Sequence, residues 1–308
     1  MWLNQLTASY RRSTVWTKVA FFALLLSVML MWTREASATG MEGFSSANFT
    51  EKNGVGIFDK FYVDIYDQLV FNSMKNDFEV GQIVNSTKPS EKSLVLDIGS
   101  GTGHHVAALT EKGYKAVGID ISQEMVAKSK ANYPNNDFTV KDAMNGNSFG
   151  ANEFTHITCL YFTIYYFQNK QQFFQNCFTW LKPGGHLVVH LTNRNTFDPI
   201  LPPGNPLMMV SPQKYAKKRI TSTAVSFDKF KYEANFALDG ANDTATFEER
   251  FRNRDNGETF RKNKHHFYME KQSVILQYAL RSGFSLVKKV DMASAQYENQ
   301  YLYVLVKD

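Results

Sequence analysis

The stretch Leu94-Val95-Leu96-Asp97-Ile98-Gly99-Ser100-Gly101-Thr102-Gly103 decides the fold class of this chain. A short apolar run, residues 94–98, leads directly into three glycines spaced G-x-G-x-G, and a helical segment follows from residue 104. A glycine-rich turn between a strand and a helix lets the backbone approach a ligand closely. The pattern therefore predicts a ligand-binding loop at the carboxyl end of a buried strand.

The spacing of these glycines discriminates between classes of nucleotide ligand. A dinucleotide site carries G-x-G-x-x-G, with a helix N-terminus facing a pyrophosphate, and a P-loop carries a Lys-Ser/Thr pair. This loop has neither pattern, and Asp97 lies two residues before its first glycine. A carboxylate at that position suits a cationic ligand with an ammonium group better than a polyphosphate.

Two more carboxylates lie where the next two strands end. Asp120 ends the run 117–120, where it can hold both hydroxyls of a ribose. Asp142 and Ala143 follow the run 138–140, where a carboxylate can accept a hydrogen bond from an adenine amino group. Each residue alone has an ordinary explanation as a turn or capping residue. Their occurrence at three successive strand ends predicts a single ligand site.

Strands and helices alternate on both sides of the loop. The patterns predict strands at 94–98, 116–119, 138–140, 155–161 and 186–191, and helices at 104–112, 122–132 and 171–181, after one or two helices within 57–85. This alternation predicts an α/β, Rossmann-like, doubly wound and mostly parallel sheet. We expect residues 57–308 to form this domain.

A different pattern begins after residue 192. Polar and apolar residues alternate in 230–238, and turn signals at Asp239-Gly240 and Asn256-Gly257 separate this segment from 244–252 and 259–269. Alternation with such turns is typical of antiparallel hairpins. We therefore expect an antiparallel β flap, residues 211–269, inserted before a helix at 273–282 and two closing strands at 284–290 and 301–307.

The motifs together resemble those of the class I S-adenosylmethionine-dependent methyltransferases. They are the Asp97-to-Gly103 loop, residues 118–122 with Met125, Asp142-Ala143, and residues 181–185. The resemblance covers roughly residues 57–191 and, more loosely, the C-terminus. It implies a seven-stranded sheet whose last strand is antiparallel, with S-adenosylmethionine as cofactor. The cofactor residues that it implies are Tyr66, Asp97, Gly99, Gly101, Gly103, Asp120, Ile121, Met125, Asp142, Ala143 and Leu160.

A finer resemblance concerns the acceptor. Tyr66-Asp67, residues 76–79 and residues 158–166 are similar to the small-molecule branch that includes the sugar-amine N-methyltransferases. In that branch the early Tyr-Asp helix closes over the cofactor and an aromatic residue after the fourth strand faces the acceptor, which implies these roles for Tyr66 and Tyr166. The flap is longer than this branch implies, so a small-molecule, sugar or lipid acceptor, and N- or O-methylation, stay open.

Few residues qualify as catalytic groups for methyl transfer. In-line displacement at a sulfonium depends mainly on orientation, and only hydroxyl acceptors usually need a base or metal. Tyr165 and Tyr166 are candidates for orienting the acceptor, with aromatic packing as the alternative, and His190 is a candidate base, although buried histidines are more often structural. His265-His266 lies on a flap strand, where at most one ring can face the site, and we expect a solvent-facing pair. The sequence has no metal-ligand spacing, so no metal is expected.

The N-terminal segment is a candidate membrane-targeting element. Residues 19–32 are apolar except for Ser27, which is short against the roughly 20 residues of a membrane span, although Lys18 can snorkel and lengthen it. Ala36-Ser37-Ala38 also fits a signal-peptidase site. Residues 1–38 are therefore expected to be either a single-pass membrane anchor or a signal peptide cleaved after Ala38, and residues 39–56 a linker.

The overall composition excludes several classes of protein and leaves two alternatives. Two cysteines exclude a disulfide framework. The net charge of +5 is modest, and nothing in the sequence resembles a nucleic-acid-binding module. A NAD(P)-dependent oxidoreductase is disfavoured by the glycine spacing and Asp97. A non-catalytic nucleotide-binding protein is disfavoured by the intact loop. The oligomeric state is left open.

Overall fold

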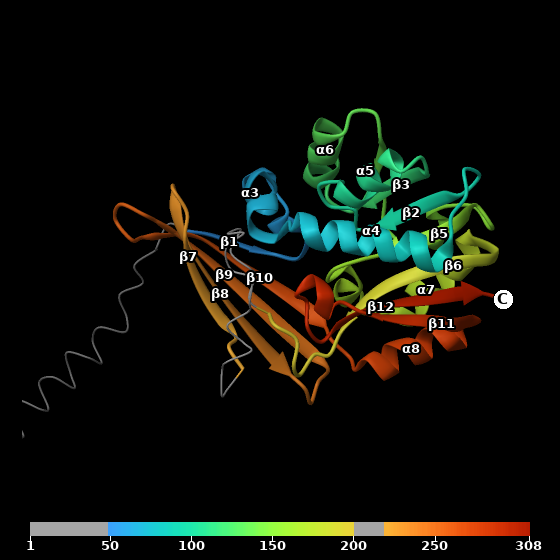
Figure 1. Cartoon of the computed structure of the whole chain (residues 1–308). Coiled ribbons are helices and arrows are strands. Elements are labelled where there is room, and N and C mark those ends of the chain that lie inside the picture. Colours follow the sequence, from blue (N-terminus) through green and yellow to red (C-terminus); the bar gives the residue numbers. More distant parts are fainter. Residues whose placement is uncertain (1–48, 200–218) are drawn as a thin grey trace, which may run out of the picture. The chain divides into compact units, whose positions relative to one another are not determined.

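A computed structural model of the protein describes residues 49–199 and 219–308, and its central element is a seven-stranded sheet (Figure 1). The strand order is β11-β12-β6-β5-β2-β3-β4. The strands are β2 (Leu94–Ile98), β3 (Lys115–Asp120), β4 (Asp137–Val140), β5 (Phe154–Cys159), β6 (Leu181–Thr192), β11 (Phe284–Asp291) and β12 (Gln300–Lys307). Neighbours from β6 to β4 are parallel, whereas β12 runs antiparallel to both β6 and β11. The predicted Rossmann-like sheet with an antiparallel last strand is confirmed.

Helices between the strands cover this sheet. They are α3 (Lys60–Val70), α4 (Ser73–Thr87), α5 (His104–Glu111), α6 (Gln123–Asn132), α7 (Lys170–Trp180) and α8 (Gln272–Arg281). Because helices cover parallel sheets on both faces, central strands such as β5 are nearly all buried. The Ser122 side chain accepts from the Met125 amide and caps α6, as its position in the sequence predicts.

A second sheet of five strands has the order β1-β10-β9-β8-β7. Its strands are β1 (Thr50–Asn53), β7 (Ser222–Ser226), β8 (Phe230–Asp239), β9 (Thr244–Asn253) and β10 (Thr259–Tyr268), of which β7–β10 are orange in Figure 1. Buried and exposed residues alternate along β8, β9 and β10. The antiparallel flap expected from that alternation is confirmed for these strands, while its expected start, residues 211–218, lies outside the described residues.

The expected linker, residues 39–56, needs correction where the structure describes it. Residues 50–53 form β1, which pairs in parallel with the edge of β10, and η1 (Gly54–Ile57) follows. The sequence of β1 shows no alternation of apolar residues, because its side chains are mostly exposed and backbone hydrogen bonds attach it to β10. Edge strands held in this way leave little trace in a hydrophobic pattern.

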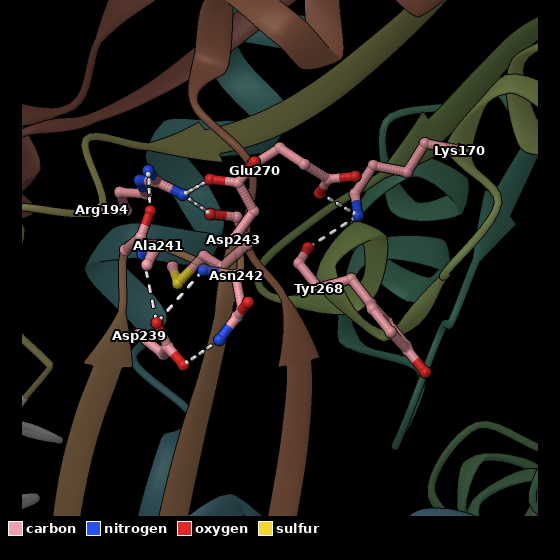
Figure 2. A network of polar contacts seen from close by, with 10 residues as sticks. Lys170, Arg194, Asp239, Ala241, Asn242, Asp243, Tyr268 and Glu270 are labelled. Carbon is pink, nitrogen blue, oxygen red and sulfur yellow. Dashed lines mark hydrogen bonds and ion pairs between the residues drawn. The ribbon is translucent and has the colours of Figure 1, made fainter.

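Two buried cations fix one end of the second sheet to the central domain (Figure 2). Arg194, just after β6, donates to the Asp243 carboxylate and, at 2.7 Å, to the carbonyl oxygen of Met269. Lys170, at the start of α7, forms an ion pair of 2.6 Å with Glu270 and donates to the Tyr268 carbonyl at 2.7 Å. Buried ion pairs fix geometry well when further hydrogen bonds satisfy the charges. The end of β10 is thereby held beside β6 and α7.

The expected membrane anchor or signal peptide, residues 1–38, lies outside the described residues. Within 49–199 and 219–308, no helix combines the length and apolar character that a membrane crossing requires.

Candidate active site

A cavity of about 640 Å³ opens beside the glycine loop, at the carboxyl ends of β2, β3 and β5. The amides of Gly99 and Ser100 donate to the Ile119 carbonyl at 2.8 and 2.9 Å, which ties the loop to β3. A Cβ atom on Gly99 would lie 2.5 Å from Thr163, and the φ angle there is +70°. Only glycine allows so close an approach, so this loop forms an open backbone wall of the cavity.

Asp120 lies in this wall with both carboxylate oxygens fixed. Oδ2 accepts from the Gly101 amide at 3.0 Å and Oδ1 from the Ser122 amide at 2.9 Å. Each carboxylate oxygen has a second lone pair that can accept from a ligand hydroxyl. Burial raises the pKa of Asp120, although these two amides oppose the rise.

The neighbouring part of the cavity wall is apolar and ends at Asp142. Met125 is buried and Ile121 is half exposed at 49%, so their side chains flank the cavity floor and rim. Asp142 accepts from the Met144 amide at 2.8 Å, which orients the carboxylate beside Ala143. This arrangement suits a flat base with a polar edge.

A smaller pocket of about 90 Å³ shares Tyr66, Gly99, Gly101 and Tyr161 with the cavity, and it contains Asp97. Asp97 is buried, which raises its pKa, and it accepts from the Thr158 hydroxyl at 2.6 Å. Leu160 also lines this pocket. The cavity therefore continues into a polar recess with a carboxylate.

The recess also contains an ion-pair network that the sequence analysis missed. Lys75 and Glu79 pair at 2.8 Å within α4, and His105 Nε2 lies 2.9 Å from Glu79 Oε2. Burial alone would raise the pKa of Glu79, but Lys75 and His105 lower it to about 2. The sequence could have indicated this ion pair, because Lys75 and Glu79 are four residues apart and such residues share a helix face.

Aromatic side chains form the opposite wall of the cavity. They include Phe58, Tyr62, Phe162, Tyr166 and Phe247. Among the described lining residues, Lys141 at the Asp142 end is the one lysine or arginine. This wall offers ring faces and hydroxyl groups to a second ligand.

Tyr166 connects that wall to a buried histidine on β10. Its hydroxyl lies 2.7 Å from His265 Nδ1, and His265 Nε2 lies 2.9 Å from Glu249 Oε2. The expectation of a solvent-facing pair is wrong for His265, which is 3% exposed, because strand alternation turns His265 inward and leaves His266 exposed.

The sequence analysis also missed Glu249. The sequence could have indicated it, because Glu249 occupies a position in β9 where the alternation predicts an apolar residue. The buried positions of this strand are Ala245, Phe247, Glu249 and Phe251. An acidic residue in the apolar phase of a strand needs buried partners. Glu249 has them in His265 and other side chains of the sheet.

Three residues from the predicted site lie away from the cavity wall. Tyr165 is fully buried and its hydroxyl accepts from the Thr192 amide at 2.8 Å. His190 is also fully buried, and burial, with Lys75 adding to it, lowers its pKa to about 4. Gly103 begins α5, where a Cβ atom would lie 2.7 Å from Phe138. The structure therefore places Tyr165 and His190 in the core, in contrast to the expected contact with an acceptor.

Comparisons with known proteins agree with this geometry. Residues 96–189 match a family model described as a methyltransferase domain. A phosphoethanolamine N-methyltransferase of Plasmodium falciparum (isolate 3D7) is 33% identical over 116 residues, which are 35% of this chain and 42% of the relative. The match therefore spans less than half of that relative's length.

Many solved structures share the fold, among them the following two. A S-adenosylmethionine-dependent methyltransferase from Clostridium acetobutylicum ATCC 824 has a TM-score of 0.60 and 18% identity, over 80% of this chain and 97% of that one. An amino pentose methyltransferase from Micromonospora echinaspora has a TM-score of 0.56 and 15% identity, over 76% of this chain and 90% of that one. These likenesses describe the fold.

The strand order and the glycine loop define a class I methyltransferase fold. With the family model that matches residues 96–189, they show a methyltransferase domain of the S-adenosylmethionine-dependent kind, with S-adenosylmethionine as methyl donor. The family and cofactor expected from the sequence motifs are confirmed.

The residues present fit this cofactor. The recess around Asp97 suits its amino-acid end, Asp120 has lone pairs available for the ribose hydroxyls, and Met125 and Ile121 can flank the adenine. When bound, S-adenosylmethionine supplies a methyl group activated by a positively charged sulfur.

Proposed function

We propose that this enzyme methylates an amine nitrogen of a small molecule with an apolar or cationic body. The observation that carries the proposal is the aromatic wall of the cavity, which includes Tyr166, Phe58 and Phe247. Aromatic faces attract ammonium groups by about 0.5–2 kcal/mol. The names of two relatives, a phosphoethanolamine N-methyltransferase and an amino pentose methyltransferase, also indicate amine acceptors.

The chain's own residues would act mainly by orientation. Asp97 and Asp120 would hold the amino-acid end and the ribose of the donor, with Tyr66 beside them, while Tyr166 would hold the acceptor. A direct in-line transfer needs this collinear arrangement, and good orientation alone contributes several kcal/mol to catalysis. The acceptor nitrogen must also carry a free lone pair.

An acceptor screen tests this function. The full chain is incubated with methyl-labelled S-adenosylmethionine and, in separate reactions, ethanolamine, phosphoethanolamine, glucosamine, 2-phenylethylamine and phosphatidylethanolamine vesicles. We expect a labelled amine product with equimolar S-adenosylhomocysteine. Binding of NADH in place of S-adenosylhomocysteine in titration calorimetry would instead support an oxidoreductase. Binding of S-adenosylhomocysteine with no labelled product from any acceptor class would support a non-catalytic binding protein.

We further propose that residues 1–38 target the enzyme to a membrane, as a single-pass anchor or as a signal peptide. Support comes from the apolar run 19–32 and the adjoining Ala36-Ser37-Ala38. Protease protection on intact membranes, with the mass of the mature chain, separates the two forms. Persistence of residues 1–38 in the membrane fraction indicates an anchor, a chain starting at Thr39 indicates cleavage, and a soluble intact chain contradicts both.

A further inference from the structure

A buried carboxylate on β9 lies at the centre of the second sheet's inward face. Glu249 is 1% exposed, and four side chains donate to it. Tyr62 and Tyr232 contact Oε1 at 2.9 and 2.8 Å, and Asn263 and His265 contact Oε2 at 2.8 and 2.9 Å. Burial opposes its ionisation, but His265 and these hydrogen bonds lower its pKa overall. Glu249 is therefore an ionised carboxylate at neutral pH.

These contacts define the tautomer of His265. An ionised carboxylate only accepts hydrogen bonds, so the hydrogen of the neutral ring lies on Nε2 and Nδ1 is an acceptor. The Tyr166 hydroxyl lies 2.7 Å from Nδ1 and therefore donates to it. The remaining lone pairs of the Tyr166 oxygen are then available to accept a hydrogen bond. Burial holds the pKa of Tyr166 well above its ordinary value, so the phenol stays protonated.

The three side chains lead from the cavity to the interior of the sheet. Tyr166 and His265 both line the cavity, whereas Glu249 lies behind them. The Phe58 ring packs edge-on against both Tyr166 and His265, at 6.1 Å from each. The orientation of an acceptor by Tyr166 does not require a buried carboxylate hydrogen-bonded to His265. The function proposed above therefore does not explain Glu249.

We propose that Glu249, His265 and Tyr166 form a proton relay that deprotonates the acceptor amine before methyl transfer. This inference rests on the proposed amine acceptor. Aliphatic amines have pKa values of about 10 and are mostly protonated at neutral pH. An ammonium N–H bond breaks and its proton goes to the Tyr166 oxygen, while the Tyr166 proton goes to Nδ1 of His265. The nitrogen keeps the bonding electron pair as its lone pair, and Glu249 stabilises the resulting imidazolium.

Several titratable side chains from neighbouring elements surround the relay. The groups that face it are Glu249 on β9, Tyr62 and Tyr66 on α3, Tyr232 on β8, and Asp120 on β3, which acts on Tyr166. Arg261 on β10 is the nearby cation, but it donates to Asn263 and pairs with Asp59 rather than with Glu249. The relay requires a bare Nδ1 on His265, because that nitrogen takes the proton of Tyr166.

Substitutions of the relay separate this role from a purely structural one. Glu249→Gln and Tyr166→Phe should each lower kcat by about 10²-fold, within the usual contribution of acid–base catalysis. Glu249→Gln should also change the pH profile of kcat, since its neutral amide no longer stabilises the imidazolium that the relay forms. Tyr165→Phe is the matched control, because Tyr165 is an adjacent tyrosine whose hydroxyl contacts the Thr192 backbone. It should keep the wild-type pH profile.

A second readout needs no acceptor. Nitrogen-15 spectra of the full chain, labelled at histidine and bound to S-adenosylhomocysteine, report the tautomer of each ring, with His265→Asn assigning the signal. We expect a hydrogen on Nε2 and a bare Nδ1 at mildly alkaline pH. A hydrogen on Nδ1, or unchanged kcat profiles in Glu249→Gln and Tyr166→Phe, would overturn the relay. Loss of S-adenosylhomocysteine binding by wild type would instead overturn the proposed function.

Discussion

Replacement of Asp120 by alanine should weaken cofactor binding about a hundredfold. The carboxylate has one lone pair on each oxygen left after the Gly101 and Ser122 amides are bound, at 3.0 and 2.9 Å. Two ribose hydroxyls donating to this charged acceptor are worth about 1.5 kcal/mol each. A loss of about 3 kcal/mol corresponds to about two orders of magnitude in affinity.

The same substitution should also lower stability, since it leaves two backbone amides without their acceptor. Each orphaned buried amide costs about 1–3 kcal/mol, and each kcal/mol lowers the melting temperature of a domain of this size by about 2–4 °C. Calorimetric titration with S-adenosylhomocysteine, well below the melting temperature, isolates the binding effect. Asp137→Ala is the control, because Asp137 is an exposed aspartate at the start of β4.

The reasoning fails if Asp120→Ala binds S-adenosylhomocysteine within about twofold of wild type while it unfolds at a lower temperature. That result would mean that Asp120 only orders the loop and that the ribose lies elsewhere. Equal weakening by Asp137→Ala would point to a general effect of charge.

Three further substitutions test other parts of the site. Asp97→Asn should weaken cofactor binding yet keep or raise the melting temperature at neutral pH. The pKa of Asp97 is raised in the folded protein, so its ionised form lowers stability. This loss of stability disappears as the pH falls through that pKa. Gly99→Ala should abolish S-adenosylhomocysteine binding because of the 2.5 Å approach to Thr163, whereas Gly184→Ala, also at positive φ but with nothing within 4 Å, should retain it. Glu79→Gln should lower the unfolding free energy at neutral pH and flatten its decline between about pH 4.5 and 2, because the lowered pKa of Glu79 gives wild type stability that is lost over that interval; an unchanged acid unfolding curve would contradict this assignment.

Local patterns predicted the cofactor end of the site from the sequence. The glycine loop follows β2, Asp120 ends β3 and Asp142 lies two residues after β4. The carboxyl ends of parallel strands meet at one edge of a sheet. The positions of these residues relative to one another therefore follow from chain order alone. The flap hairpins were predictable from local alternation and turn residues.

The acceptor end depends on contacts between distant segments, which no local pattern contains. Tyr166 and His265 are 99 positions apart, and Tyr62 and Glu249 are 187 apart. Periodicity placed His265 and His266 on opposite faces of one strand, but it could not say which face was buried. Tyr165 and Tyr166 are likewise adjacent in the chain, and only the packing of η3 (Thr163–Tyr166) decides which hydroxyl reaches the cavity.

The attachment of β10 by Arg194 and Lys170 makes strand register a determinant of acid–base chemistry (Figure 2). Lys170 and Arg194 bind the carbonyl groups of Tyr268 and Met269 and so fix these two residues. The number of residues between His265 and Tyr268 then determines which side chain faces Tyr166. A single inserted residue between His266 and Tyr268 would invert the alternation and place His266 at the inward position that His265 occupies. Acceptor specificity could then change through spacing alone, with every side chain of the cavity wall retained.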